Sequence, residues 1–482
     1  MDSPRCSNNS NSTRCDMREI LFILFCLLNI QSFGVTYYVA TNGSDSNPGT
    51  LSQPWRNILY GCRQLSAGDI LYVRSGTYML TARIDIRSFT NGTAINPIRV
   101  MGYPSDINRP VIDATNLYRL SVMCVIRQQY WYFDRLIFQH AEQDGQENEV
   151  DGVEVEYSGN IIFNYCDFRS NDGCGVDVIN CSTVYFTDCD AYYNYDKDSG
   201  DAGNAADGFS GYTTADVGWD QFVYLKRCRS WNNSDDGIAF GMRTRAVYDS
   251  CWSMCNGYLR DGTPSYSGRG FNVGQNWAAP PAPSDQYIIK NCVSVYNRSV
   301  GFRNNSNATT CNVDARWYNN TSAFNGSYGF NGSHGTNEGT RIYRNNIAYA
   351  NPTAFFMKAG MTYISDHNTW DSGMPSVTNT DFISTDTTGM KAPRNSDGSL
   401  PDNNFYRNFL KPKTIASFID VGVNVGFPFS GRAPDLGYWE YGFIPEPPEP
   451  PPPPPPPPPL TDTIFIFNNN RRVILNNKII IR

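Results

Sequence analysis

A short pattern of apolar and polar positions recurs along the middle of the chain. Each copy has a glycine, then a large apolar residue, then a variable and mostly polar residue, and copies lie roughly 22 to 33 residues apart. Because side chains alternate along a β-strand, each copy predicts a strand with one buried and one exposed face. A unit of this length cannot bury a core alone, so neighbouring units must stack. The apolar residues that follow the glycines are Val153, Val176, Phe209, Ile238, Phe271, Phe302 and Phe330.

This repeat predicts an all-β fold, a parallel β-helix solenoid with one coil per repeat. The apolar position forms a column that points into the core, and the next position forms a column that points outward. Any function should lie on this outward face and in the two longest loops, 196–205 and 258–268, since long loops on a rigid scaffold carry binding sites. The outward column holds Glu154, Asp177, Ser210, Ala239, Asn272, Arg303 and Asn331.

The segments at the two ends of the repeats predict caps. Residues 36–79 predict a strand at 37–39, a loop, a short capping helix near 54–65 and a strand after Asp69. An open β-helix end exposes unpaired strand edges, and this amphipathic helix would cover them. Residues 393–443 lack the repeat and predict a C-terminal cap that folds back on the β-helix. We therefore expect one β-helix domain over residues 35–443.

The remaining segments lie outside this domain. Residues 1–34 form an N-terminal extension in which Met17 is a candidate start and an apolar run spans 20–30, as in a secretory signal peptide. A signal anchor or a buried strand is the alternative. Residues 444–460 predict a polyproline linker, and residues 461–482 form a short tail of unknown role. The signal peptide indicates a secreted, extracellular protein.

Composition narrows the function. A net charge of −7 argues against nucleic-acid binding, and we expect a monomer.

Several of the 14 cysteines occupy equivalent places in successive coils; they predict a ladder of buried thiols, with disulfides between coils as the alternative. These cysteines are Cys166, Cys189, Cys228, Cys251 and Cys292. Sequons typical of a glycoprotein begin at Asn42, Asn91, Asn297, Asn307, Asn320 and Asn325. Asn297 is alternatively a turn or ladder asparagine that satisfies backbone groups.

A group of aspartates precedes two adjacent copies of the repeat. Stacked coils would bring Asp207 and Asp236 to about 4.8 Å, the spacing between strands. Carboxylates that close need a proton or a cation between them, and Ca²⁺ prefers oxygen ligands. Asp207, Asp235 and Asp236 are therefore candidate metal ligands. A bare turn at Asp235-Asp236-Gly237 is the alternative, since aspartate and glycine favour turns.

Several motifs resemble those of known proteins. Residues 37–50 resemble the opening of pectate-lyase-like right-handed parallel β-helices. More specific motifs, which resemble family-nine polysaccharide lyases, occur at 233–237, 251–258, 268–274, 366–368, 397–401 and 435–437. The resemblance covers roughly residues 36–442. It implies calcium-assisted β-elimination of a uronate polymer such as pectate, with the three aspartates as calcium ligands.

The sequence also departs from that family. Ala239 stands where the family has a fourth aspartate, which weakens the calcium prediction, and Asn272 stands where it has the catalytic lysine. Asparagine cannot act as a base near neutral pH. Arg303 and Arg269 are candidates to bind the substrate carboxylate or to replace the base, and Asp177 is a further candidate substrate contact. Three alternatives follow: a lyase with a non-standard base, a non-catalytic carbohydrate-binding protein, and a cell-surface or matrix β-helix protein.

Overall fold

The computed structural model describes residues 34–145, 150–198, 203–214, 221–241, 243–274, 286–305, 313–332 and 339–442. Except for Gly34, the N-terminal extension lies outside the described residues, as do the polyproline linker and the tail. The sequon at Asn307 lies outside them as well. Within the described ranges, no helix is long and apolar enough to cross a membrane.

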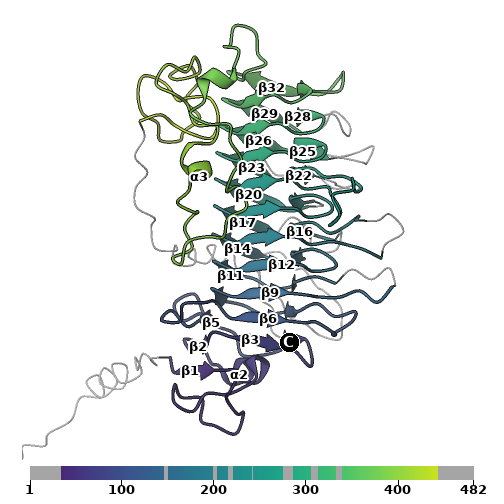
Figure 1. Cartoon of the computed structure of the whole chain (residues 1–482), viewed down its shortest axis with the longest axis vertical. Coiled ribbons are helices and arrows are strands. Elements are labelled where there is room, and N and C mark those ends of the chain that lie inside the picture. The colour runs from purple at the N-terminus through teal and green to yellow at the C-terminus, as the bar shows by residue number, and fades with distance from the viewer. Residues whose placement is uncertain are drawn as a thin grey trace, which may run out of the picture.

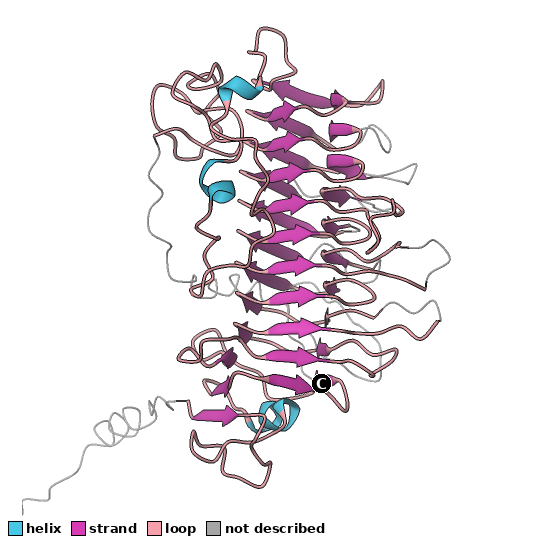
Figure 2. Cartoon of the chain, in the orientation of Figure 1, coloured by secondary structure: helices cyan, strands magenta, loops and turns pink. Residues whose placement is uncertain are grey.

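Three parallel sheets run the length of the molecule and enclose one continuous core (Figure 1, Figure 2). The first sheet contains β1 (Thr36–Val39), β2 (Ile70–Val73), β5 (Ile98–Gly102), β8 (Trp131–Asp134), β11 (Ile161–Asn164), β14 (Thr183–Thr187), β17 (Phe222–Lys226), β20 (Arg245–Asp249), β23 (Tyr287–Lys290), β26 (Ala315–Tyr318), β29 (Arg341–Arg344) and β32 (Tyr363–Asp366). The second sheet contains β4 (Ile84–Arg87), β7 (Met123–Ile126), β10 (Val153–Glu156), β13 (Val176–Ile179), β16 (Phe209–Tyr212), β19 (Ile238–Phe240), β22 (Phe271–Gly274), β25 (Val300–Asn305), β28 (Tyr328–Asn331) and β31 (Thr353–Phe356). The third sheet contains β3 (Thr77–Met79), β6 (Val111–Asp113), β9 (Ile137–Gln139), β12 (Asp167–Arg169), β15 (Asp190–Tyr192), β18 (Arg229–Trp231), β21 (Trp252–Met254), β24 (Val293–Val295), β27 (Thr321–Ala323) and β30 (Ile347–Tyr349).

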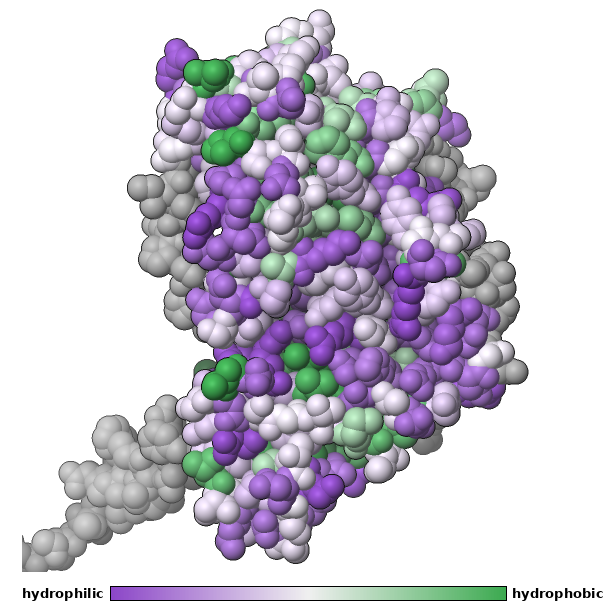
Figure 3. Space-filling view, in the orientation of Figure 1, coloured by the Kyte–Doolittle hydropathy of each residue, from purple (hydrophilic) through white to green (hydrophobic). Residues whose placement is uncertain are grey.

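The register of the second sheet confirms the predicted columns. Phe209 pairs with Ile238, and Ile238 pairs with Phe271, so the apolar column points into the core. On the outward side Ala239 pairs with Asn272, and Asn272 pairs with Arg303. Apolar residues gather inside the coils, whereas hydrophilic residues cover much of the face seen in Figure 3. The parallel β-helix prediction is confirmed.

The N-terminal end is capped by a short helix, as predicted. Helix α2 (Ile58–Gln64) begins four residues after Pro54, because the side chain of Asn57 accepts hydrogen bonds from the backbone N–H groups of Leu59 and Tyr60. Its buried face joins the main core through Ile58 and Cys62. The apolar end of the coils is therefore covered rather than left open to another chain.

A ladder of asparagines, all buried except the partly exposed Asn351, lines the turn between the third and second sheets. The Nδ2 group of each asparagine donates to the Oδ1 atom of the asparagine in the next coil, at 2.9 to 3.1 Å. The ladder comprises Asn171, Asn194, Asn233, Asn256, Asn297, Asn325 and Asn351. These amides satisfy each other and the backbone, which holds successive turns in one shape.

The ladder corrects part of the glycosylation prediction. The sequon residues Asn297 and Asn325 belong to it, and Asn320 belongs to a second ladder with Asn346. All three are at most 2% exposed, so their amides cannot carry a glycan in the folded protein. Asn42 and Asn91 are exposed, and their glycosylation stays a prediction.

The cysteines also form a ladder. Cys166, Cys189, Cys228, Cys251 and Cys292 are buried, carry free thiols, and donate to backbone carbonyl oxygens of their own and the preceding coil. The buried-thiol prediction is confirmed over disulfides between these coils. The thiols fill the space at the turn between the first and third sheets as small apolar groups.

Residues 372–442, here called the strap, return along the outside of the coils (Figure 1). The strap contains the 3₁₀ helix η1 (Asn379–Asp381) and helix α3 (Asn404–Asn408), and it buries a second apolar cluster against the third sheet, where Phe405 and Phe409 pack near Trp252. The prediction that the C-terminal segment folds back is confirmed. This segment lies on the flank of the coils, where outward apolar residues of the third sheet need cover.

Candidate functional site

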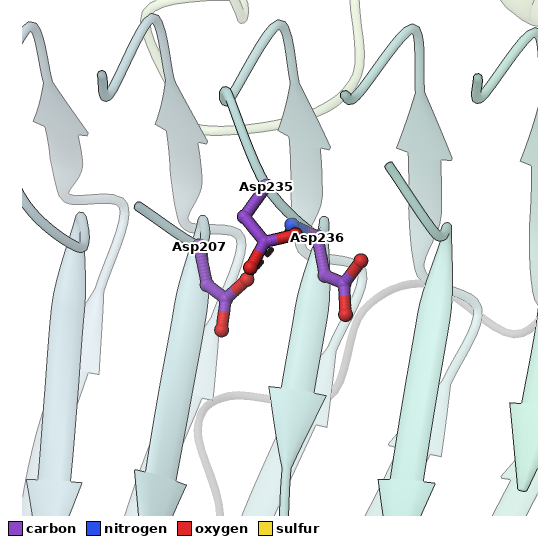
Figure 4. A group of neighbouring side chains, drawn as sticks. All are labelled: Asp207, Asp235 and Asp236. Carbon is purple, nitrogen blue, oxygen red and sulfur yellow. Dashed lines mark hydrogen bonds between the residues drawn. The ribbon is translucent and has the colours of Figure 1, made fainter. Parts of the chain in front are cut away.

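Three aspartates converge where the third sheet turns into the second. Asp207 comes two residues before β16, and Asp235 and Asp236 come just before β19 in the next coil. The asparagine ladder fixes this turn, because Asn233 is fully buried and bonded to Asn256. One oxygen from each of the three carboxylates lies within 4.8 Å of the others (Figure 4). The stacking of adjacent coils therefore brings these carboxylates together, as the sequence predicts.

The three carboxylates are buried and partly held by backbone donors. The Asp236 N–H donates to Asp207 Oδ1 at 2.8 Å, and the Ala205 N–H donates to Asp235 Oδ2 at 3.2 Å. Burial and the charges of the two neighbouring aspartates raise the pKa of Asp207 well above its usual range. Burial, followed by the charge of Asp236, raises the pKa of Asp235 to about 7. Without a cation, the cluster therefore tends to hold a proton at neutral pH.

The donor set fits a calcium ion. All three side chains offer oxygen, the ligand that Ca²⁺ prefers. Asp235 Oδ1 is buried and has no hydrogen-bond partner among the described residues. A buried carboxylate oxygen without a partner is costly unless something binds it. The cluster thus has the composition, spacing and unpaired oxygen of a cation site.

Two further side chains hold Asp236. The Arg269 backbone N–H donates to Asp236 Oδ1 at 2.7 Å, and its guanidinium Nη1 donates to Oδ2 at 3.1 Å. Asn272 Nδ2 donates to the same Oδ2 at 2.8 Å. Burial alone would lower the pKa of Arg269, but Asp236 and Asp235 outweigh it and raise this pKa. Arg269 is therefore a permanent cation that orients Asp236, which makes it unsuited to remove a proton.

Arg303 differs from Arg269 in its surroundings. It lies in the next coil of the outward column and is 9% exposed. Its Nε atom is buried without a partner in the described part of the chain. Burial, and then repulsion by Arg269, lowers the pKa of Arg303 to about 10. The structure thus separates two arginines that the sequence left equivalent.

A cleft of about 340 Å³ lies over these residues. Its floor comes from β16, β19, β22 and β25, and its lining includes the three aspartates, Ala239, Arg269, Asn272 and Arg303. Asn204 from loop 196–205 and Tyr266 and Ser267 from loop 258–268 complete it, which confirms that the long loops flank the site. Sequence reasoning missed these three loop residues because loops have no repeat register. Asp177 pairs with Ser210 in register but does not line the described cleft.

A coiled parallel β-helix with a carboxylate cluster over one sheet defines a protein of the pectate-lyase-like class. The family model described as "Pel9A-like, right handed beta helix region" matches residues 37–337, and the chain belongs to that family. The resemblance to right-handed parallel β-helices of this kind is thereby confirmed.

Individual relatives agree with this assignment. The chain is 29% identical over 424 residues to pectate lyase L of Dickeya dadantii (strain 3937), and 30% identical over 417 residues to pectate lyase L of Dickeya chrysanthemi. Each match covers 84% of this chain and 90% of the relative. Among solved structures, the crystal structure of pectate lyase Pel9A matches with a TM-score of 0.69 at 27% identity, over 85% of this chain and 97% of that one. These relatives support membership of a polysaccharide lyase family.

Proposed function

We propose that the protein is a secreted lyase that cleaves a uronate polysaccharide, such as pectate, by calcium-assisted β-elimination. The observation that carries this proposal is the buried cluster of Asp207, Asp235 and Asp236 at the floor of a cleft that also contains cationic side chains. Calcium, when bound there, supplies positive charge that neutralises the substrate carboxylate and acidifies the carbon-bound proton beside it. The polymer is extracellular, which agrees with the signal peptide that residues 1–34 predict.

Arg303 is the base in this proposal. It would take the proton from the carbon next to the substrate carboxylate, and the bond to the leaving glycosidic oxygen then breaks as the double bond forms. Burial lowers the pKa of Arg303 to about 10, so a larger share of its side chain is neutral in mildly alkaline solution than for an ordinary arginine with a pKa of 12.5. Burial, with no ion pair to Arg303 among the described residues, therefore makes this arginine a better base than Arg269.

A non-catalytic carbohydrate-binding protein is the second candidate. Asn272 favours it, because this residue occupies the position of the family's lysine and is hydrogen-bonded to Asp236. In that case the cleft would bind an acidic polysaccharide through calcium and Arg303 without cleaving it. A cell-surface or matrix role, with the polyproline segment as a spacer, is the remaining alternative.

The proposal is tested with the full-length secreted protein and two polymers, polygalacturonate and rhamnogalacturonan. Ultraviolet absorbance of the unsaturated product is followed with calcium and then with a chelator. We expect calcium-dependent product, and a rate that increases with pH towards 10. Arg303→Ala should lower kcat about 10²- to 10⁴-fold, the range for a lost general base, whereas Arg303→Lys should keep part of the rate.

Arg344→Ala is the matched control, since Arg344 is an outward arginine of the first sheet and does not line the cleft. Calcium-dependent cleavage that survives Arg303→Ala unchanged would remove Arg303 as the base. No product from either polymer, together with calcium-dependent polymer binding, would establish the binding protein instead.

A further inference from the structure

We propose that the side-chain oxygen of Asn272 is a ligand of the calcium site, and that it replaces the carboxylate missing at Ala239. This inference rests on the proposed function, because it assumes that Asp207, Asp235 and Asp236 hold a cation. It gives Asn272 a role in this chain that differs from the base at the same position in the family.

The two departures from the family pattern are direct neighbours in the sheet. Ala239 in β19 pairs with Asn272 in β22, and both side chains point outward into the same cleft. Paired residues of adjacent strands are about 4.8 Å apart, so an oxygen lost from one position can be supplied from the other. We therefore infer that the two substitutions belong together: position 239 has lost an oxygen ligand, and Asn272 in the neighbouring strand supplies one in its place.

The hydrogen bond to Asp236 fixes the orientation of the Asn272 amide. A carboxylate only accepts hydrogen bonds, so Nδ2 must be the atom that faces Asp236 Oδ2, at 2.8 Å. The carbonyl oxygen Oδ1 therefore takes no part in the hydrogen bond to Asp236. It is buried and has no hydrogen-bond partner among the described residues, and the whole side chain is only 7% exposed.

An unpaired buried amide oxygen carries a penalty of about 1 to 3 kcal/mol unless a ligand binds it. Asp235 Oδ1, in the same cleft, is buried and unpaired too. Amide oxygens of asparagine are ordinary ligands of Ca²⁺, beside carboxylates. Asn272 Oδ1 and Asp235 Oδ1 are thus two buried, unpaired oxygens of one cleft beside an acidic cluster, which favours a cation that both oxygens coordinate.

The experiment measures Ca²⁺ affinity of the calcium-depleted, full-length protein by titration calorimetry, with Tb³⁺ luminescence as a second readout. Asn272→Leu has a similar shape without the oxygen, and Asn272→Asp supplies an oxygen but cannot donate to Asp236. Asn331→Leu is the control, since Asn331 lies in the same outward column, two coils beyond Asn272, and is absent from the cleft lining. Circular dichroism and thermal unfolding show whether each variant is folded.

We expect Asn272→Leu to weaken calcium binding about tenfold or more, Asn272→Asp to bind calcium at least as tightly as the parent, and the control to leave the affinity unchanged. Equal losses in the Leu and Asp variants would mean that only the hydrogen bond to Asp236 matters, and would overturn the inference. Unchanged affinity in a folded Asn272→Leu variant would overturn it while leaving the proposed cation site intact. A parent protein that binds no calcium, even with polymer present, would refute the cation site itself.

Discussion

Replacing Asp235 with asparagine should stabilise the calcium-free protein above neutral pH and remove its response to calcium. Burial, and then the charge of Asp236, raises the pKa of Asp235 from 3.8 to about 7. Because the pKa of Asp235 is higher in the folded state than in the unfolded chain, Asp235 stays protonated to a higher pH in the folded protein. Stability is therefore lost as the pH rises from about 4 to about 7. In Asp235→Asn this charge is absent at every pH.

The size of the effect follows from the same pKa. At 1.36 kcal/mol per pKa unit, ionising Asp235 destabilises the folded state by about 4 kcal/mol at pH 8 relative to pH 4. With an unfolding entropy of about 2.1 cal/mol/K per residue over roughly 400 folded residues, that difference corresponds to a change in Tm of about 5 °C. A cation bound at the proposed site would offset this repulsion, so calcium should raise the Tm of the parent.

The assay is thermal unfolding from pH 4.5 to 8 in chelator and in calcium. In chelator, the variant should unfold at a higher Tm than the parent at pH 8, and the difference should shrink to about a quarter near pH 4.5. In calcium, the parent should gain Tm and the variant should gain little. Asp261→Asn is the control, because hydrogen bonds from Thr263 lower the pKa of that exposed loop aspartate and keep it ionised throughout. A Tm difference between variant and parent that does not change with pH would refute the reasoning.

Other substitutions test the remaining features of the structure. Ala239→Asp returns a carboxylate beside Asn272 in register, and we expect about tenfold tighter calcium binding by calorimetry, with a lower Tm in chelator. Asn256→Ala removes ladder hydrogen bonds to Asn297 and Ser253 and should lower the free energy of unfolding in urea by about 2 to 4 kcal/mol. Asp190→Ala leaves the fully buried side chain of Arg229 without its carboxylate and leaves Arg394 with Asp188 alone; a loss of about 3 to 5 kcal/mol and faster proteolysis of the strap are expected.

The sequence predicted the features that repeat. The glycine and apolar positions fixed the register of the second sheet, and the register brought Asp207 and Asp236 together. Features that depend on contacts across the repeats were missed. The pattern gives Arg269 and Arg303 the same candidate roles. Only the contacts show that Arg269 pairs with Asp236, whereas Arg303 forms no ion pair among the described residues.

Other errors have the same physical origin. In the sequence Asn297 fits both a sequon and a ladder asparagine, and the structure shows the ladder asparagine. Asn325 was predicted only as a sequon, yet its amide is buried in the same ladder. The strap has no period, so its path could not be read from the sequence. Its docking depends on outward apolar residues of the third sheet such as Trp252, which the alternation alone assigns to solvent.

The strap affects how this solenoid can unfold. A stack in which each coil touches only its neighbours can open from either end or at any weak coil. Here Arg394 of the strap binds Asp190 near the middle of the third sheet, while Tyr438 bonds to Thr321 four coils further along. A cut in either long loop would therefore not release half of the molecule, because the strap spans the break on the opposite flank. The coils that the strap crosses should therefore unfold together as one cooperative unit, and the cleft lies within that unit.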